Sequence, residues 1–197
     1  MKNNYWIVDD WLIFKPKFNE ELTDYYDIIN QCKKIMFSNY DDPLILIETN
    51  NQYKYEYEKN YIKSEFNQEI NVLNNTNLTH LTFGKHFNKK IFIPLNVENL
   101  KMCKCNNQYI IDNLHNNIKE LNIYETNLNL NNLPNSIKKL YINEYNEELN
   151  NLPNSIEYLE LKNYNLKIRK IPKNLKTVKC NKKYKYIDDF KDYEVIT

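Results

Sequence analysis

The chain has 197 residues, enough for one ordinary domain, and its 27 Lys and Arg nearly balance its 26 Asp and Glu. A formal net charge of +1 excludes strong overall attraction to polyanions, so we expect no nucleic-acid partner. No apolar run reaches the roughly 18 residues of a membrane span, and residues 1–6 lack the features of a secretory signal, so we expect an intracellular protein without a membrane partner.

The first 31 residues predict a small cap with one helix. Apolar residues at 6–8 and 11–14 are typical of one or two short strands. The segment Asn19-Glu-Glu-Leu-Thr-Asp24 predicts a helix that runs to about Gln31. Asn19 is the expected N-cap, because its side chain suits that position and two glutamates follow it.

Residues 32–73 predict irregular first coils of a repeat structure. Cys32-Lys-Lys-Ile-Met-Phe37 fits the strand pattern of the later repeats, and Gln52-Tyr-Lys-Tyr-Glu-Tyr57 fits it loosely. We therefore expect the stacked structure to begin near residue 32.

Residues 74–180 contain six similar segments that begin 19, 21, 19, 19 and 19 residues apart. They are Leu78–Phe83, Val97–Met102, Ile118–Ile123, Ile137–Ile142, Ile156–Leu161 and Leu175–Cys180. A fixed period this short is typical of a solenoid, in which each unit buries its apolar face against its neighbours.

Each segment alternates apolar and polar residues, which predicts a strand with one buried face. In Lys139-Leu140-Tyr141-Ile142, for example, Leu140 and Ile142 should point inward. The roughly nine residues left for the return to the next strand are too few for a full helix and its turns, so we expect extended return limbs. Residues 181–197 depart from the repeat and, being rich in aromatic and branched apolar residues, are expected to form a second cap.

Two motifs resemble known repeat families. Leu133-Pro-Asn-Ser-Ile137 and Leu152-Pro-Asn-Ser-Ile156 are similar to the short leucine-rich repeats of bacterial effector proteins. The segment Leu78-Thr-His-Leu-Thr-Phe-Gly84, followed by Phe87, Asn88 and Ile91, is similar to the FNIP repeat of social amoebae and of giant viruses of amoebae.

The repeat pattern and this resemblance together predict an α/β, strand-dominated, leucine-rich-repeat-like solenoid with a parallel β-sheet on its concave face. The expected organisation is one domain over residues 1–197, divided into an N-terminal cap (1–31), irregular first coils (32–73), regular repeats (74–180) and a C-terminal cap (181–197).

Asparagines recur in register where the chain leaves each strand. They are Asn106, Asn127, Asn146 and Asn165. A side-chain amide can bond the backbone groups freed at a turn, and stacked copies can bond one another. We interpret these four residues as a structural ladder that holds the turns, rather than as the lining of a ligand groove.

Nothing in the sequence indicates catalysis, a metal site or a cofactor. His80, His86 and His115 have no nucleophile or carboxylate pair at a suitable spacing. A single glycine, Gly84, excludes a glycine-rich phosphate loop. Four cysteines without metal-ligand spacing are typical of reduced thiols in a protein without disulfides.

The exposed face of the sheet is therefore the expected interaction surface. Its outward positions include Thr82 and Cys103, and the candidate binding residues are Lys101, Tyr124, Lys139, Tyr141, Tyr158 and Glu160. The three tyrosines should run diagonally across three adjacent strands. Aromatic side chains flanked by charges are typical of protein-binding surfaces, although a chain with 17 tyrosines would place several on any open sheet.

These observations favour a non-catalytic scaffold that binds a protein through the concave sheet, and the viral resemblance implies a host protein and a site of action in the host cytoplasm.

The alternative is a substrate-recruiting adaptor of a ubiquitin ligase, because an F-box precedes the repeats in several FNIP relatives. Phe18-Asn-Glu-Glu-Leu22 is only weakly similar to the start of an F-box. Burial of Leu22, Tyr25, Tyr26 and Ile29 against the first coil would count against the adaptor. Nucleic-acid binding through Lys101, Lys139, Lys162 and Lys179 would need these lysines on one face.

Overall fold

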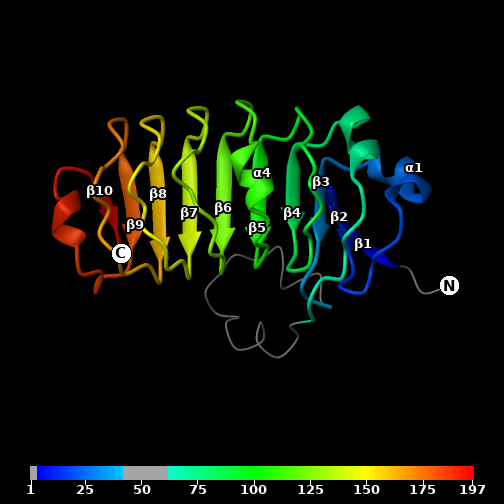
Figure 1. The fold of residues 1–197 in the computed structure, drawn as a ribbon, viewed down its shortest axis with the longest axis horizontal. Coiled ribbons are helices and arrows are strands. Elements are labelled where there is room, and N and C mark those ends of the chain that lie inside the picture. Colours follow the sequence, from blue (N-terminus) through cyan, green and yellow to red (C-terminus); the bar gives the residue numbers. More distant parts are fainter. Residues whose placement is uncertain (1–3, 42–61) are drawn as a thin grey trace.

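The computed structural model describes residues 4–41 and 62–197. Within these ranges, ten strands form one sheet whose order in space follows the chain (Figure 1). The strands are β1 (Tyr5–Val8), β2 (Trp11–Phe14), β3 (Lys34–Phe37), β4 (His80–Phe83), β5 (Asn99–Cys103), β6 (Glu120–Tyr124), β7 (Lys139–Asn143), β8 (Tyr158–Lys162), β9 (Thr177–Cys180) and β10 (Glu194–Ile196). Strands β1 and β2 pair antiparallel, and every later pair is parallel.

The predicted strand-dominated, leucine-rich-repeat-like solenoid is thus confirmed, as are the short strands at the start of the chain and the strand before residue 38. The strand pattern expected at Gln52–Tyr57 lies outside the described residues.

The inward face of the sheet is a set of aligned apolar columns. Leu121, Leu140 and Leu159 are direct neighbours on β6, β7 and β8, and each is fully buried. Ile142 lies in the next column and is also fully buried. Burying one such side chain stabilises a fold by about 1.5–3 kcal/mol, so the columns supply the main force that stacks the coils.

The chain leaves four successive strands through one residue in the left-handed region. These residues are Lys104, Glu125, Glu144 and Asn163, with φ of 57°, 47°, 51° and 54°. A residue with a Cβ pays about 1–2 kcal/mol for this conformation. Hydrogen bonds to the next strand offset the cost, since the backbone N–H of Glu125 donates to the carbonyl oxygen of Asn143 at 2.9 Å and that of Glu144 to Lys162 at 3.0 Å.

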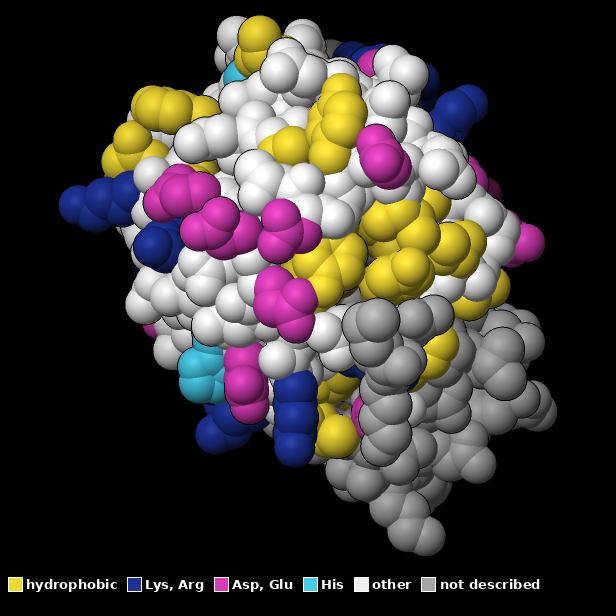
Figure 2. All heavy atoms as spheres, turned by 90° about the vertical axis from the view of Figure 1, so that its right-hand side faces the viewer, with side chains coloured by type: hydrophobic (Ala, Val, Ile, Leu, Met, Phe, Trp, Pro, Cys, Tyr) yellow, Lys and Arg dark blue, Asp and Glu magenta, His cyan; other side chains and the backbone are white. Residues whose placement is uncertain are grey.

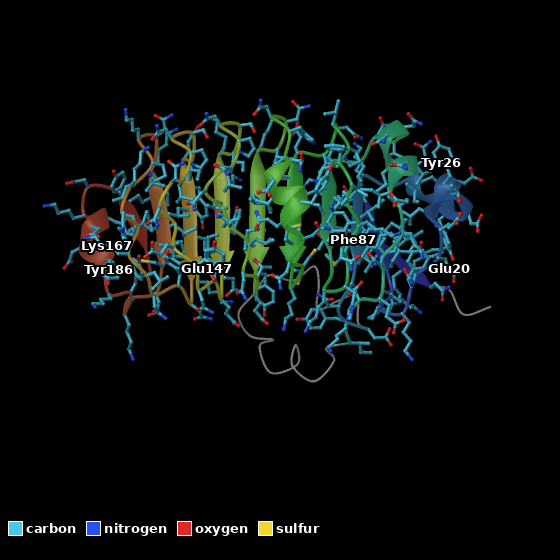
Figure 3. All side chains as sticks on the ribbon, in the orientation of Figure 1. Glu20, Tyr26, Phe87, Glu147, Lys167 and Tyr186 are labelled. Carbon is cyan, nitrogen blue, oxygen red and sulfur yellow. The ribbon has the colours of Figure 1, made fainter. Side chains whose placement is uncertain are left out.

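An aromatic spine fills the core beside these turns. In the first coils it is made of phenylalanines: Phe37 stacks on Phe66 with ring centroids 3.6 Å apart, and Phe83 on Phe87 at 4.1 Å. Figure 3 labels Phe87 in this part of the molecule. In the last coils the same column holds Tyr145, Tyr164 and Tyr184, all buried. Their hydroxyls bond the backbone of the preceding coil, with Tyr145 donating to the carbonyl oxygen of Leu128 at 2.6 Å.

The return limbs are short and mostly irregular, as expected. The unit between β5 and β6 is two residues longer than its neighbours and accommodates α4 (Gln108–Asp112). A 3₁₀ turn, η3 (Asn71–Asn75), precedes β4.

The predicted helix near residue 19 is shorter than expected, and the prediction of Asn19 as its N-cap was wrong. The helical segment consists of a 3₁₀ turn, η1 (Leu22–Tyr25), and one turn of α-helix, α1 (Tyr26–Ile29). Oδ1 of Asn19 instead accepts hydrogen bonds from the backbone N–H of Asn67 at 2.8 Å and from the side chain of Gln68 at 3.2 Å. Because the next coil occupies this oxygen, it caps no helix.

Two positions predicted to face outward are buried. Thr82 is 5% exposed and Cys103 is 9% exposed. Asn39 follows β3 by two residues, and its buried side chain donates from Nδ2 to the carbonyl oxygen of Cys103, the last residue of β5, at 3.1 Å. Asn39 thus covers the backbone of Cys103 at the end of β5, which removes part of this residue from solvent.

The two ends of the solenoid differ. Figure 2 views the N-terminal end, where hydrophobic side chains lie beside acidic ones. On this end Ile7 of β1 is 51% exposed. At the other end η4 (Ile187–Phe190) precedes β10, and Tyr184 and Phe190 are buried against the last coil.

Candidate functional site

The six predicted binding residues all lie on β5–β8, on the outward face of the sheet. Lys101 of β5, Tyr141 of β7 and Glu160 of β8 belong to one row, in which Asn122 of β6 stands between Lys101 and Tyr141. Lys139 and Tyr158 are direct neighbours in a second row. Because the strands are about 4.8 Å apart, the structure brings these side chains onto one surface, which we call the tyrosine face. It is made of Lys101, Tyr124, Lys139, Tyr141, Tyr158 and Glu160.

The three tyrosines follow the expected diagonal, since they occupy the fifth, third and first positions of β6, β7 and β8. The rings of Tyr141 and Tyr158 are 5.4 Å apart and tilted by 45°. The hydroxyl of Tyr158 donates to Oε2 of Glu160 at 3.0 Å. Each of the three residues is half-buried, so each keeps part of its surface open to solvent.

Burial raises the pKa of all three tyrosines. The pKa of Tyr141 rises to about 12, mainly through desolvation and further through the carboxylates of Glu120 and Glu160. Desolvation also raises the pKa of Tyr124 and of Tyr158, each helped by a neighbouring glutamate. All three hydroxyls therefore stay protonated at neutral pH. Those of Tyr124 and Tyr158 already bond Glu125 and Glu160, which leaves the Tyr141 hydroxyl as the donor for a carbonyl or carboxylate oxygen.

Most charges on the tyrosine face are paired across strands. Nζ of Lys139 lies 3.6 Å from Glu120, and Nζ of Lys179 lies 3.3 Å from Glu160. Lys101, Lys139, Lys162 and Lys179 do share this face, but two of them are neutralised. Exposed ion pairs of this kind contribute about 0–1 kcal/mol each, so they shape the surface more than they stabilise the fold.

The predicted asparagine ladder is formed at one of its three steps. The backbone N–H of Asn127 donates to Oδ1 of Asn106 at 2.9 Å. Between the described residues, Asn146 and Asn165 form no such bond. Two equivalent steps occur earlier in the chain, where Asn67 donates to Asn19 at 2.8 Å and Asn88 to Asn67 at 3.0 Å. The role of the four predicted asparagines as one ladder stays a prediction.

The histidines and cysteines have structural surroundings. Nε2 of His115 lies 3.0 Å from the carbonyl oxygen of Pro94, and the ring of His80 contacts that of Trp11. Burial, followed by the charge of Lys34, lowers the pKa of His80. Burial raises the pKa of Cys105 to about 12, so this thiol is unreactive at neutral pH. Within residues 4–41 and 62–197, no cluster of three or more His, Cys, Asp or Glu is placed to hold a metal ion.

Sequence reasoning missed an apolar groove on the return limb between β4 and β5. It has a volume of about 550 Å³ and is lined by Phe92, Ile93, Leu95 and polar residues that include Asn74, Asn113 and His115. Phe92 is 67% exposed and Leu95 70% exposed, more than any other large hydrophobic side chain in the described part of the chain. The one sequence feature that could have indicated the groove is the apolar run Phe92-Ile-Pro-Leu95, which lies outside the predicted strands.

No helix in the described ranges is long and apolar enough to cross a membrane.

The ordered parallel sheet and short return limbs define a leucine-rich-repeat-like protein. The FNIP Repeat family matches residues 124–164, which span β7 and β8 and confirm the resemblance to FNIP repeats. The chain is therefore a repeat protein that carries FNIP repeats over these residues. Scaffolds of this kind generally bind proteins and are typically non-catalytic.

A solved structure of a giant-virus protein, CroV588, described as a novel circular LRR protein structure, is similar to this chain. The two share 24% sequence identity with a TM-score of 0.46, over 90% of this chain and 38% of the other. This chain thus spans well under half the length of CroV588. No curated protein matches the chain.

Proposed function

We propose that the chain is a non-catalytic scaffold that binds a partner protein through the tyrosine face. If the chain is a viral protein, as its resemblance to FNIP repeats of giant viruses implies, the partner is a host protein. The observation that carries this proposal is the placement of Tyr124, Tyr141 and Tyr158 on three adjacent strands. Tyrosine offers large contact area at a small cost in conformational entropy, and such residues dominate binding energy at many interfaces.

The charges around the tyrosines support a protein partner. Lys139 and Glu160 already form ion pairs within the sheet. A partner can therefore bind here without providing charged groups to neutralise them. Lys101 has no carboxylate within ion-pair distance among the described residues and is available at the margin of the face. A surface with an aromatic centre and charged margins fits the usual anatomy of a protein interface.

The cap segments have a supporting role in the proposal. We propose that residues 1–31 and 181–197 close the ends of the stack, and that residues 32–73 and 74–180 supply the coils between them, so that the whole forms one domain. A stack without end caps would expose two apolar faces.

The ligase adaptor is the weaker candidate. Leu22 and Ile29 are buried, and the ring of Tyr25 packs against those of Tyr5 and Phe14. Tyr26 is 38% exposed and alone departs from this pattern. The apolar side of the helical segment therefore faces its own core, which argues against a docking helix.

The test is a photo-crosslinking capture. Benzoylphenylalanine at Asn122, in the centre of the tyrosine face, should crosslink one partner protein from amoebal lysate. The same group at Phe92, on the return limb, is the matched control and should crosslink nothing specific. Recovery of the same proteins at both positions would contradict the proposal.

A second arm tests the tyrosines themselves. A Tyr124→Ser, Tyr141→Ser, Tyr158→Ser variant should lose the partner, whereas a Phe92→Ser, Leu95→Ser variant, which also removes exposed apolar area, should retain it. Thermal unfolding of both variants establishes that they are folded. Recovery of ubiquitin-ligase subunits by either variant would support the adaptor instead.

A further inference from the structure

The near-neutral total charge conceals a strongly basic segment. Between residues 162 and 185 there are ten basic residues and no Asp or Glu. They are Lys162, Lys167, Arg169, Lys170, Lys173, Lys176, Lys179, Lys182, Lys183 and Lys185. This segment runs from the end of β8 to the turn after β9, so the basic charge is concentrated in the last coil.

Four of the ten are neutralised by carboxylates of neighbouring coils. The partners are Asp189 for Lys167, Glu148 for Arg169, Glu157 for Lys176 and Glu160 for Lys179, at 3.4, 3.3, 2.6 and 3.3 Å. Hydrogen bonds from Lys176 and Lys138 lower the pKa of Glu157, which keeps this partner ionised. These pairs are part of the stacking of coils.

The other six form no ion pair with any described residue, and four of them meet at one edge of the sheet. Lys162 is the last residue of β8, and Lys182, Lys183 and Lys185 follow the last residue of β9. Because β8 and β9 are adjacent and parallel, their carboxyl ends lie at the same edge (Figure 1). All four side chains are exposed, and we call this group the basic edge.

The backbone under the basic edge is held firmly. Oδ1 of Asn181 accepts from the backbone N–H of Lys183 at 2.8 Å, and the N–H of Tyr184 donates to the carbonyl oxygen of Asn181 at 2.8 Å. Tyr184 is itself buried, and its hydroxyl donates to the carbonyl oxygen of Leu166 at 2.6 Å. The side chains of Lys182, Lys183 and Lys185 thus extend from a turn that hydrogen bonds hold in place.

We propose that the basic edge binds an acidic segment of a partner protein. Four ammonium groups without an ion pair among the described residues present strong positive potential to one side of the molecule, and carboxylates on a flexible segment can adjust to them. The site is independent of the three tyrosines, although Lys162 lies in the same row as Tyr124 and makes the two surfaces continuous.

An acidic protein segment suits this edge better than a nucleic acid. Proteins that bind single-stranded nucleic acid usually combine a basic groove with free aromatic rings on which the bases stack. The nearby ring, Tyr186, is already covered by Lys167 and Lys185, whose Nζ atoms lie 5.8 and 5.3 Å from its centroid. Figure 3 shows Lys167 and Tyr186 next to each other at this end.

The experiment measures fluorescence anisotropy of a labelled dodecameric glutamate peptide at about 0.05 M salt, where screening is weak. The natural chain should bind it, and a Lys182→Gln, Lys183→Gln, Lys185→Gln variant should bind about tenfold more weakly. A Lys17→Gln, Lys63→Gln, Lys90→Gln variant is the matched control, because it loses the same charge from exposed lysines elsewhere. Its affinity should change less than about twofold.

Each other outcome overturns the proposal. Equal losses in the two variants would mean that only net charge matters, and a natural chain that does not bind has no such site. Tighter binding of a single-stranded RNA dodecamer, lost in the same variant, would assign the edge to nucleic acid. The serine variant of the three tyrosines should bind the peptide normally, so failure here is distinct from failure of the tyrosine face.

Discussion

Asn39 and Cys103 stand 64 residues apart in the sequence, and Nδ2 of Asn39 donates to the carbonyl oxygen of Cys103 at 3.1 Å. Oδ1 of Asn39 accepts from the backbone N–H groups of Ser64 and Lys85, each at 3.0 Å. One buried amide therefore joins backbone groups from three later parts of the chain. It satisfies them where no strand pairing does.

Replacement of Asn39 by alanine should lower the free energy of unfolding by about 3 kcal/mol, because it leaves two buried backbone groups and one part-buried group without a partner. Urea denaturation followed by circular dichroism measures this change. The control is Asn165→Ala, at an exposed asparagine without a bond to its neighbouring coils, which should cost less than about 0.5 kcal/mol. Similar losses in the two variants would contradict the role assigned to Asn39.

Gly84 is the sole glycine of the chain, and its hydrogen atoms face a crowded site. A Cβ built there would lie 2.3 Å from Cβ of Ser64 and 2.8 Å from the carbonyl oxygen of Phe37. A Gly84→Ala variant should therefore be destabilised by about 3 kcal/mol through overpacking, measured by the same denaturation.

The double variant Gly84→Ala, Ser64→Gly isolates this clash. Removal of the Ser64 side chain relieves the shortest contact, so the double variant should be more stable than the sum of the two single changes predicts. Additive losses would show that Gly84 is required for some other reason.

The asparagine ladder yields a graded prediction. Asn106→Ala removes a bond to the backbone of Asn127 and should cost about 1 kcal/mol, whereas Asn146→Ala should be nearly neutral. The comparison of denaturation midpoints checks this difference. Equal effects at both positions would mean that the asparagines act through the turn conformation rather than through bonds between coils.

The repeat could be predicted from the sequence because it depends on a local alternation of apolar and polar residues that recurs at a fixed spacing. Alternation identified Leu140 and Ile142 as inward residues, and both are fully buried. The outward rows of β5–β8 followed from the same alternation, so the six candidate binding residues could be placed on one face before their contacts were known.

Other features could not be predicted, because they depend on distant parts of the chain. Asn19 looked like an N-cap, yet its partner is the backbone of Asn67, 48 residues away. Phe18, interpreted as the start of a faint F-box motif, stacks on Phe66 as part of the aromatic spine. The spacing of residues 18–19 and of Asn39 does not follow the later repeats, so neither the Phe-Asn pair nor the bond from Asn39 to Cys103 was expected. The groove at Phe92 and Leu95 had no periodic signal either.

The buried tyrosines predict sensitivity to alkaline pH. Burial raises the pKa of Tyr164 to about 12, against about 10 in the unfolded chain, so between these values the folded state binds more protons. The stability is fully present below about pH 10 and is lost as pH rises through about 12. Tyr145 and Tyr184 have pKa values raised in the same direction and add to the loss.

A Tyr164→Phe variant separates the two contributions of this hydroxyl. At neutral pH it should lose about 1 kcal/mol with the hydrogen bond from the backbone N–H of Leu149. Between about pH 10 and 12 its unfolding free energy should fall less steeply than that of the natural chain. Denaturation at several pH values measures both effects, and identical slopes would contradict the assigned pKa.

Thr126 occupies the position in the spine that Tyr145 and Tyr164 fill in the next coils, but its side chain cannot reach the return limb. It is buried, and its hydroxyl has no hydrogen-bond partner in the described part of the structure. Thr126→Val removes the unpaired hydroxyl at nearly constant volume and should raise the unfolding free energy by about 1 kcal/mol. Thr126→Ser keeps the hydroxyl, loses the methyl group and should lower it by about 1 kcal/mol. A less stable valine variant would mean that the hydroxyl has a partner and that the spine is continuous through this coil.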